Sequence, residues 1–337
     1  MNKRNIRLTL SYDGTDFSGW QRQRNARSAQ EELEKALSKM HGDAVLTVAA
    51  GRTDAGVHAL GQTANFYTDI RSIPAGKFVP ALNKLLPRDL RVLESRDAEF
   101  DFHSRYDARL RRYRYFAVSG PSPDPFKLRY AHYLRRRPDL SRLNAMASRL
   151  LGENDFTSFS SARDESLSRS RLVYEASFRW EADLLVFEIA ANAFLLRMVR
   201  SIVGSLFAFE AEGRDADWVS GAMSAKDRDL AGPTAPARGL FLWNVEYHAS
   251  PTQPGRGSYW ADRKLGAETA VAEPGGEPAA AAFGAGKLAA FDTAADVPAA
   301  SEREGSAAYA EGESEESEPL QASKGRRLVP GYGYAEE

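Results

Sequence analysis

A change in composition at residue 251 limits how much of this chain can fold. From Pro251 onward the sequence is a low-complexity segment rich in Ala, Gly, Pro, Ser and Glu, with 8 Lys and Arg against 15 Asp and Glu. The first 250 residues hold 37 basic and 31 acidic residues, so they carry a net positive charge and the tail a net negative one. A segment with so little periodic apolar content cannot offset the entropy lost on ordering. We therefore expect residues 251–337 to be a disordered acidic tail and residues 1–250 to contain the fold.

The apolar pattern of the first 250 residues alternates between strand and helix spacing. Residues 6–10 alternate as in a half-buried strand, and Ser28 with Glu31 forms a capping box before a helix. The pattern predicts further elements, namely strands at 45–50 and 62–67 around a loop at 51–61, a strand at 111–118, a helix at 140–152 ended by Gly152, a hairpin of 171–180 and 184–193, an apolar helix at 194–209 and a strand at 239–247. This order indicates an α+β fold of two similar halves, residues 1–105 and 106–250.

The chain contains no cysteine, which excludes disulfides, thiolate nucleophiles and cysteine-ligated metal sites and is typical of a cytoplasmic protein. Its five histidines, at positions 41, 58, 103, 132 and 248, have no spacing typical of a catalytic triad or a metal site, so we expect no metal. No apolar run approaches the roughly 18 residues of a membrane span, and we expect no membrane partner. The N-terminus runs into an alternating strand pattern rather than an apolar signal-peptide core, so we expect it to belong to the fold.

The stretch "AAGRTDAGVH", residues 49–58, places charged residues between glycines directly after a predicted strand. In an extended segment Arg52 and Asp54 point to the same side, and an adjacent guanidinium favours the ionised form of a carboxylate. The glycines permit close approach of a ligand. The alternative is a structural one, in which Asp54 forms an Asx-turn and Arg52 faces solvent. We interpret His58 as a loop residue with a role in structure or binding.

Three clusters interleave arginine with aromatic or amide side chains, at residues 21–27, 103–115 and 129–137. Arginine binds phosphate while aromatic rings stack on unpaired bases, a combination typical of RNA-binding surfaces. A solvated basic face is the alternative for any one cluster. Because three such clusters occur in the first 250 residues, which are net positive, we favour RNA as their ligand. The residues that we expect to contact it are Arg22, Arg24, Arg109, Arg111 and Arg112.

Six segments together carry a resemblance to a known family. They are "YDGTDFSGWQRQ", "AAGRTDAGVHALGQ", "FHSRYDARLRRYRY", "LLGENDFTSFSSA", "NAFLLRMVRSIVGSL" and "SAKDRDLAGPTAPARGLFL". In this order they span almost all of residues 6–248, and they resemble the tRNA pseudouridine synthase A family. The resemblance implies an isomerase that converts uridines 38, 39 and 40 in the anticodon stem-loop of tRNA to pseudouridine. It also implies the pseudouridine synthase fold, with largely antiparallel sheets and a central catalytic cleft, and a homodimer with tRNA lying across both subunits.

The resemblance also implies roles for individual residues. It makes Asp54 the catalytic aspartate and Arg52 its partner in the active site, places Tyr113 against the target base and brings Arg200 into the cleft from the other half. The sequence departs from the family pattern at Leu196 and Arg197, which leaves Arg197 either bound to phosphate or solvated. If both arginines lie on the predicted helix, their spacing of three puts them on neighbouring faces.

The reaction that the resemblance implies requires no cofactor or metal, because it moves a glycosidic bond from N1 to C5 without net redox change. The target base must leave its stack, and an ionised carboxylate serves either as a covalent nucleophile or as a base. Other classes remain as alternatives. A non-catalytic RNA-binding module leaves the pair of Arg52 and Asp54 unexplained, and a zinc deaminase lacks its H-x-E and C-x-x-C ligands here. A glycosylase breaks the same type of bond and is the nearest enzymatic alternative.

Overall fold

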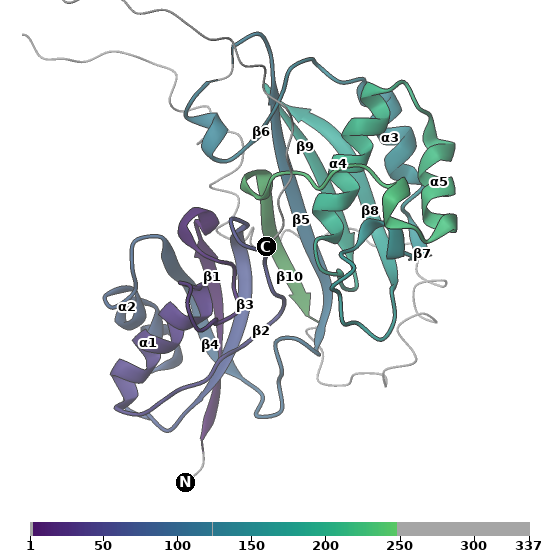
Figure 1. Ribbon diagram of the computed structural model, residues 1–337. Helices are drawn as coiled ribbons and strands as arrows, with labels where there is room; N and C mark the ends of the chain where they lie inside the picture. Colours follow the sequence, from purple (N-terminus) through teal and green to yellow (C-terminus); the bar gives the residue numbers. More distant parts are fainter. Residues whose placement is uncertain (1–2, 123, 248–337) are drawn as a thin grey trace, which may run out of the picture. The chain divides into compact units, whose positions relative to one another are not determined.

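The computed structural model describes residues 3–122 and 124–247 (Figure 1), so the predicted tail at 251–337 lies outside the described residues. All strands of the described part join one ten-stranded sheet. They are β1 (Arg4–Tyr12), β2 (Val48–Ala49), β3 (His58–Thr68), β4 (Leu90–Ala98), β5 (Ala108–Ser119), β6 (His132–Leu134), β7 (Gly152–Asp155), β8 (Ser170–Glu181), β9 (Leu184–Ala191) and β10 (Leu240–Tyr247). Their order is β4-β1-β3-β10-β5-β9-β8-β7, with β2 paired to β3 and β6 to β5.

Most neighbouring strands in this sheet are antiparallel, which confirms the predicted α+β class. The exceptions among the described residues are β10 beside β3 and β6 beside β5, which are parallel. Strands β1 to β4 come from the first predicted half and the others from the second. Because β10 lies between β3 and β5, the last strand of the second half joins the two halves at the centre of the sheet (Figure 1).

The helices are α1 (Ala29–His41), α2 (Phe78–Asn83), α3 (Leu140–Ser148), α4 (Met198–Ala211) and α5 (Ala216–Ala225). The predicted cap of α1 is confirmed, since the Glu31 N–H donates to the Ser28 side chain at 3.3 Å. The C-cap residue of this helix is Gly42, whose φ of +78° suits a residue without a Cβ. Leu33 and Leu37 of α1 are completely buried in the same apolar core as Ile202 of α4. This core therefore contains side chains of both predicted halves.

Two predicted helix boundaries are wrong. The apolar helix begins at Met198 rather than at residue 194, because Arg197 adopts the left-handed conformation, with φ of +61°, and ends the preceding turn. Helix α3 ends at Ser148, and Gly152, with φ of +89°, instead begins β7. Within the described residues, no helix is both long and apolar enough to cross a lipid bilayer.

Candidate active site

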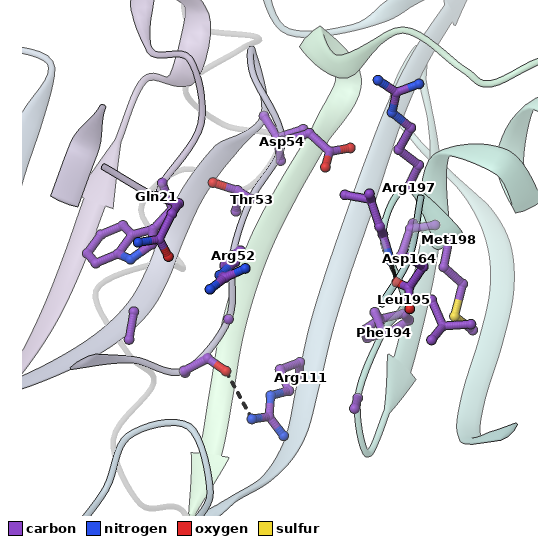
Figure 2. A pocket seen from close by; sticks show the side chains of 18 of the residues that line it. Gln21, Arg52, Thr53, Asp54, Arg111, Asp164, Phe194, Leu195, Arg197 and Met198 are labelled. Atoms are coloured by element: carbon purple, nitrogen blue, oxygen red, sulfur yellow. Dashed lines mark hydrogen bonds between the residues drawn. The ribbon is translucent and has the colours of Figure 1, made fainter. Parts of the chain in front are cut away.

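A cleft of about 940 Å³ separates the loop that follows β2 from the turn that precedes α4 (Figure 2). One wall is formed by residues 47–54 and the other by residues 163–166 and 193–200. Tyr113 of β5 and Leu240 of β10 also line it. The predicted loop at 51–61 is shorter than expected, since β3 already begins at His58. The cleft brings together residues that are more than a hundred positions apart in the sequence.

The loop that carries Asp54 is fixed by the last residue of β1 and by the segment that follows this strand. The Tyr12 hydroxyl lies 2.8 Å from Thr53 Oγ1, and the Trp20 N–H donates to the Thr53 carbonyl at 3.1 Å. A Cβ on Gly19 would lie only 2.5 Å from that carbonyl, so a glycine is needed for this close approach. Thr53 is therefore held through both its side chain and its main-chain carbonyl. These contacts fix the backbone from which the side chain of the next residue, Asp54, projects.

Asp54 forms an ion pair with Arg200, and the distance from Arg200 Nη1 to Asp54 Oδ2 is 3.0 Å. Both side chains are only partly accessible, with 17% of Arg200 and 20% of Asp54 exposed. Arg200 is itself fixed, because its Nε donates to the Ala235 carbonyl at 2.8 Å while its own carbonyl accepts the Ala235 N–H at 3.0 Å. The first turn of α4 thus delivers a rigid guanidinium to the carboxylate.

Arg52 does not occupy the position that we predicted for it. Figure 2 shows the Asp54 carboxylate reaching into the cleft while the Arg52 guanidinium stays beside its own loop. Arg52 is exposed, and within the described part of the chain it forms no hydrogen bond or ion pair. The two residues are close in sequence but their side chains diverge. Arg200 therefore takes the place expected of Arg52 as the partner of Asp54.

Tyr113 lies in the cleft as predicted and is 7% exposed. Its ring meets the Phe194 ring edge to face, with centroids 5.0 Å apart. Burial raises the pKa of Tyr113, and Tyr12 and the Asp54 carboxylate add to the rise. The hydroxyl stays protonated at neutral pH, and it has no hydrogen-bond partner among the described residues. A neutral phenol and an aromatic face are therefore available to a ligand.

Arg111 and Arg112, which we predicted to contact RNA, both have partners within the protein. Arg111 is buried and donates four hydrogen bonds of 2.6–2.9 Å to the backbone carbonyls of Ala50, Arg105, Ala108 and Asn192. Arg111 lines the cleft, but its guanidinium N–H groups bind backbone carbonyls and so connect the two walls. A phosphate would need those same N–H groups. Side chains alternate along β5, so Arg112 points to the other side of the sheet, where it pairs with Glu175 and Glu188.

Three further predicted contacts lie outside the cleft lining. Arg22 is exposed and pairs with Glu34 at 3.0 Å, Arg24 is exposed on the same loop, and Arg109 is half-buried on β5. These positions place none of the three next to Asp54. Their contact with RNA stays a prediction for the surface outside the cleft.

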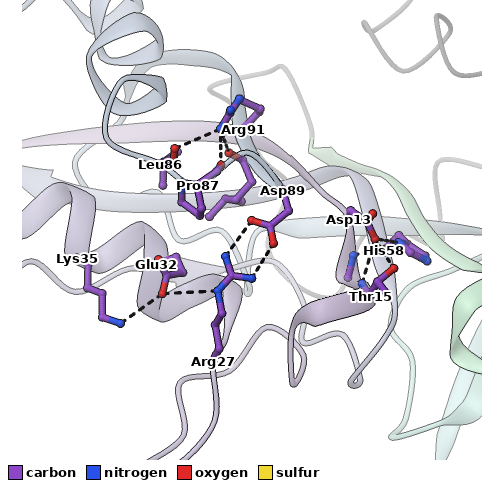
Figure 3. Close-up of polar contacts among 12 residues, drawn as sticks. Asp13, Thr15, Arg27, Glu32, Lys35, His58, Leu86, Pro87, Asp89 and Arg91 are labelled. Carbon is purple, nitrogen blue, oxygen red and sulfur yellow. Dashed lines mark hydrogen bonds and ion pairs between the residues drawn. The ribbon is translucent and has the colours of Figure 1, made fainter. Parts of the chain in front are cut away.

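The interpretation of His58 as a loop residue is wrong. His58 begins β3, is 1% exposed, and stacks on Phe241 with ring centroids 4.5 Å apart. Its Nδ1 accepts the Gly14 N–H at 3.0 Å and lies 3.2 Å from Asp13 Oδ1 (Figure 3). Burial alone would raise the pKa of Asp13, but the contact with His58 and the hydrogen bonds from Thr15 and Tyr130 outweigh it and hold that pKa below its usual range. His58 therefore fixes the segment after β1 and is too deep to touch a ligand in the cleft.

The structure adds cleft residues that the sequence reasoning missed, namely Arg163, Asp164 and Arg171, and it also places Arg105 of the predicted cluster at 103–115 in the lining. Burial lowers the pKa of Arg171, and its Nε has no hydrogen-bond partner in the described part of the chain. Asp164 accepts the Leu196 N–H at 2.5 Å and so holds the turn that precedes α4. The alternating arginines in "SRSR", residues 168–171, are a local signal that could have pointed to Arg171.

Arg197 also lines the cleft, but it is the N-cap residue of α4 rather than part of its interior. Its side chain is exposed and has no partner among the described residues. The predicted placement of Arg197 and Arg200 on neighbouring helical faces is therefore wrong. Within residues 3–122 and 124–247, no group of three or more His, Asp or Glu side chains has the arrangement of a metal site.

Comparison with known proteins shows the family to which the chain belongs. A family model for tRNA pseudouridine synthase matches residues 9–107 and 146–248. A tRNA pseudouridine synthase A from Treponema denticola is 47% identical over 251 residues, which cover 73% of this chain and 94% of that protein. Proteins of the same name from Treponema pallidum subsp. pallidum and Bacillus subtilis are 43% and 42% identical, covering 68% and 72% of this chain and 84% and 98% of theirs. Most of the described chain, including both walls of the cleft, falls within the matched segments, and the chain belongs to the tRNA pseudouridine synthase family.

Proposed function

We propose that this chain isomerises uridine to pseudouridine at positions 38, 39 and 40 in the anticodon stem-loop of tRNA, with Asp54 as the catalytic carboxylate. Membership of the family supports the class of reaction. The observation that supports the catalytic residue is the ion pair of Asp54 with Arg200 in the cleft between the halves. It gives one carboxylate a fixed direction at the place where a nucleotide would enter.

The geometry of the pair suits a carboxylate that reacts. Arg200 engages Oδ2 of Asp54, and Oδ1 has no hydrogen-bond partner among the described residues. One oxygen is thus held while the other faces the cleft. The reaction breaks the bond from N1 to C1′, turns the uracil and forms a bond from C5 to C1′, after which the hydrogen of C5 leaves and N1 gains one. Asp54 would serve either by covalent attack or by removing a proton from the sugar.

Tyr113 and Phe194 would form the wall against which the target base rests. A base that leaves its helical stack loses a few kcal/mol of stacking and pairing, and contact with aromatic rings in the pocket offsets this loss. The hydroxyl of Tyr113, which has no partner among the described residues, would offer the base a hydrogen bond as well. This role follows from the buried position of Tyr113 beside Asp54.

The rim of the cleft suits the backbone of RNA. Four arginines of the lining form neither an ion pair nor a side-chain hydrogen bond within the described residues, and they are Arg52, Arg105, Arg163 and Arg197. Guanidiniums without carboxylate partners are free to neutralise phosphates. In this proposal Arg52 acts on the nucleotide rather than on Asp54. We also expect a cytoplasmic homodimer that holds one tRNA across both subunits, as the family resemblance implies.

The test is product analysis on unmodified tRNA tritiated at C5 of its uracils. The proposal predicts release of tritium, tRNA of unchanged mass, and pseudouridine that maps to positions 38 to 40. Free uracil would instead show a glycosylase, and binding without any product would show an RNA-binding module. Mapping pseudouridine in tRNA from cells with and without the protein tests the three positions. Unchanged maps in the two cell lines would contradict the proposal.

A further inference from the structure

The loop at residues 99–107, between β4 and β5, carries an exposed aromatic pair beside the cleft. Tyr106 is 66% exposed, although large aromatic side chains are usually buried. Its ring is stacked on the His103 ring, with centroids 4.2 Å apart and planes 25° apart. Arg105 lines the cleft, and its guanidinium lies 5.9 Å from the centroid of the Tyr106 ring. An accessible aromatic surface and a guanidinium therefore lie side by side at the edge of the site.

The loop holds this pair in a fixed arrangement. His103 Nδ1 accepts the N–H groups of both Arg105 and Tyr106 at 3.2 Å. The His103 N–H donates to the Asp107 carboxylate at 2.8 Å, and the Asp107 N–H donates back to the His103 carbonyl at 3.1 Å. The Arg105 carbonyl accepts Nη2 of Arg111 at 2.6 Å, which anchors the loop to β5. A ligand would find the rings already oriented, so little conformational entropy is lost on binding.

We propose that Tyr106 and His103 form a platform on which an unpaired base of the substrate RNA stacks, with Arg105 placed to contact phosphate. This inference rests on the proposed function, since it names a second contact of the same substrate outside the reaction pocket. A base fits the observations because every base offers a flat face to a ring and a phosphate to a guanidinium. Stacking of a base here requires no apolar surface other than the two rings. The nucleotide bound here would be a neighbour of the uridine that enters the cleft.

The experiment measures the affinity of the full-length protein for an unmodified tRNA transcript over a series of salt concentrations. The variants are Tyr106→Ala, Tyr106→Phe and Tyr106→Leu. The Ala and Leu changes should raise Kd by about 5- to 150-fold, the range for loss of one stacked base, while Phe stays within about 2-fold. The slope of log Kd against log salt should not change, because no phosphate contact is lost.

Two controls sharpen the test. Arg105→Ala should reduce the magnitude of the salt slope by about 0.7 to 0.9, as expected when one phosphate contact is removed. Phe126→Ala removes an aromatic ring that is equally exposed, at 65%, but does not line the cleft, and it should leave Kd unchanged. Thermal melting of each variant establishes that the fold is intact. Because Leu keeps the bulk of the side chain, it replaces Ala in the test if the Ala variant is unstable.

The outcomes separate this inference from the proposed function. Parental affinity in a folded Tyr106→Leu variant would overturn the platform, as would equal losses for Phe and Leu, which would assign the effect to the hydroxyl. If pseudouridine forms while the Tyr106 variants bind normally, only the platform fails. If no pseudouridine forms but loss of the ring weakens binding of tRNA, the platform stands and the proposed reaction fails.

Discussion

Replacing Arg200 with alanine tests whether the ion pair orients Asp54. The change removes the contact at 3.0 Å to Asp54 Oδ2 and the hydrogen bond at 2.8 Å to the Ala235 carbonyl. Asp54 keeps its own place, because its loop is held through Thr53 by Tyr12 and Trp20. A hydrogen bond to a charged group contributes about 1.5 to 3 kcal/mol. If all of it is expressed in the transition state, the rate of the chemical step falls by about 10- to 150-fold.

The assay is single-turnover release of tritium from tRNA tritiated at C5, with enzyme in excess, together with the Kd for tRNA. Arg200→Ala should lower the rate and leave Kd nearly unchanged, because the side chain is mostly buried behind the rim. Arg200→Lys keeps the charge but has no planar guanidinium to reach Asp54 and Ala235 together. The rate of this variant should therefore lie between those of the parent and Arg200→Ala. Arg149→Ala, which removes an ion pair with Asp217 outside the cleft lining, is the control and should not change the rate. A rate within about 2-fold of the parent for Arg200→Ala would refute the positioning role.

Three further predictions address other groups. Asp54→Asn removes the charge but keeps the shape, so tritium release should fall by several orders of magnitude while tRNA still binds; near-parental release would return Asp54 to a structural role. Tyr113→Ala should lower turnover more than affinity, and Tyr113→Phe separates the ring from the hydroxyl; a uniform loss of affinity with normal turnover would contradict the assignment. Burial opposes ionisation of Asp155, but hydrogen bonds from Thr157 and the contact with Lys226 outweigh it and lower its pKa from 3.8 to about 2. The stability that these contacts add is present above about pH 4 and is lost as the pH falls toward 2, so the difference in melting temperature between the parent and Asp155→Asn should shrink over that range; a difference that persists at pH 2 would contradict it.

Local signals in the sequence predicted the elements better than their ends. The alternation in β1 and the cap at Ser28 depend on residues close in sequence, and both predictions are confirmed. The start of α4 was misplaced because Phe194 and Leu195 continue its apolar pattern. In the structure they contact other parts of the protein from a turn that ends at Arg197. Periodicity reports which side chains are buried, not whether the backbone between them is helical.

The candidate site shows a similar division. The position of Asp54 in a glycine-flanked loop was visible in the sequence. The resemblance also placed Arg200 in the cleft, but no local pattern showed that Arg200 pairs with Asp54. Arg200 is 146 positions away, and only the pairing of strands from both halves brings it to the carboxylate. The sequence also does not reveal that the N–H groups of Arg111 donate to backbone carbonyls. A buried arginine and an RNA-binding arginine look alike in a basic cluster. Local sequence patterns therefore do not predict the role of a side chain whose partner is far away in the sequence.

The central position of β10 also has a consequence for synthesis of the protein on the ribosome. Phe241 of β10 pairs with His58 of β3, 183 positions earlier in the chain. Before β10 emerges, β3 and β5 each keep an open edge, which is prone to pairing with other chains. A nascent chain that stalls before Leu240 already contains Asp54, Tyr113 and Arg200. It lacks β10, the strand that lies between β3 and β5 and places these residues relative to one another. The emergence of β10, rather than the appearance of any catalytic side chain, therefore determines when this active site first exists.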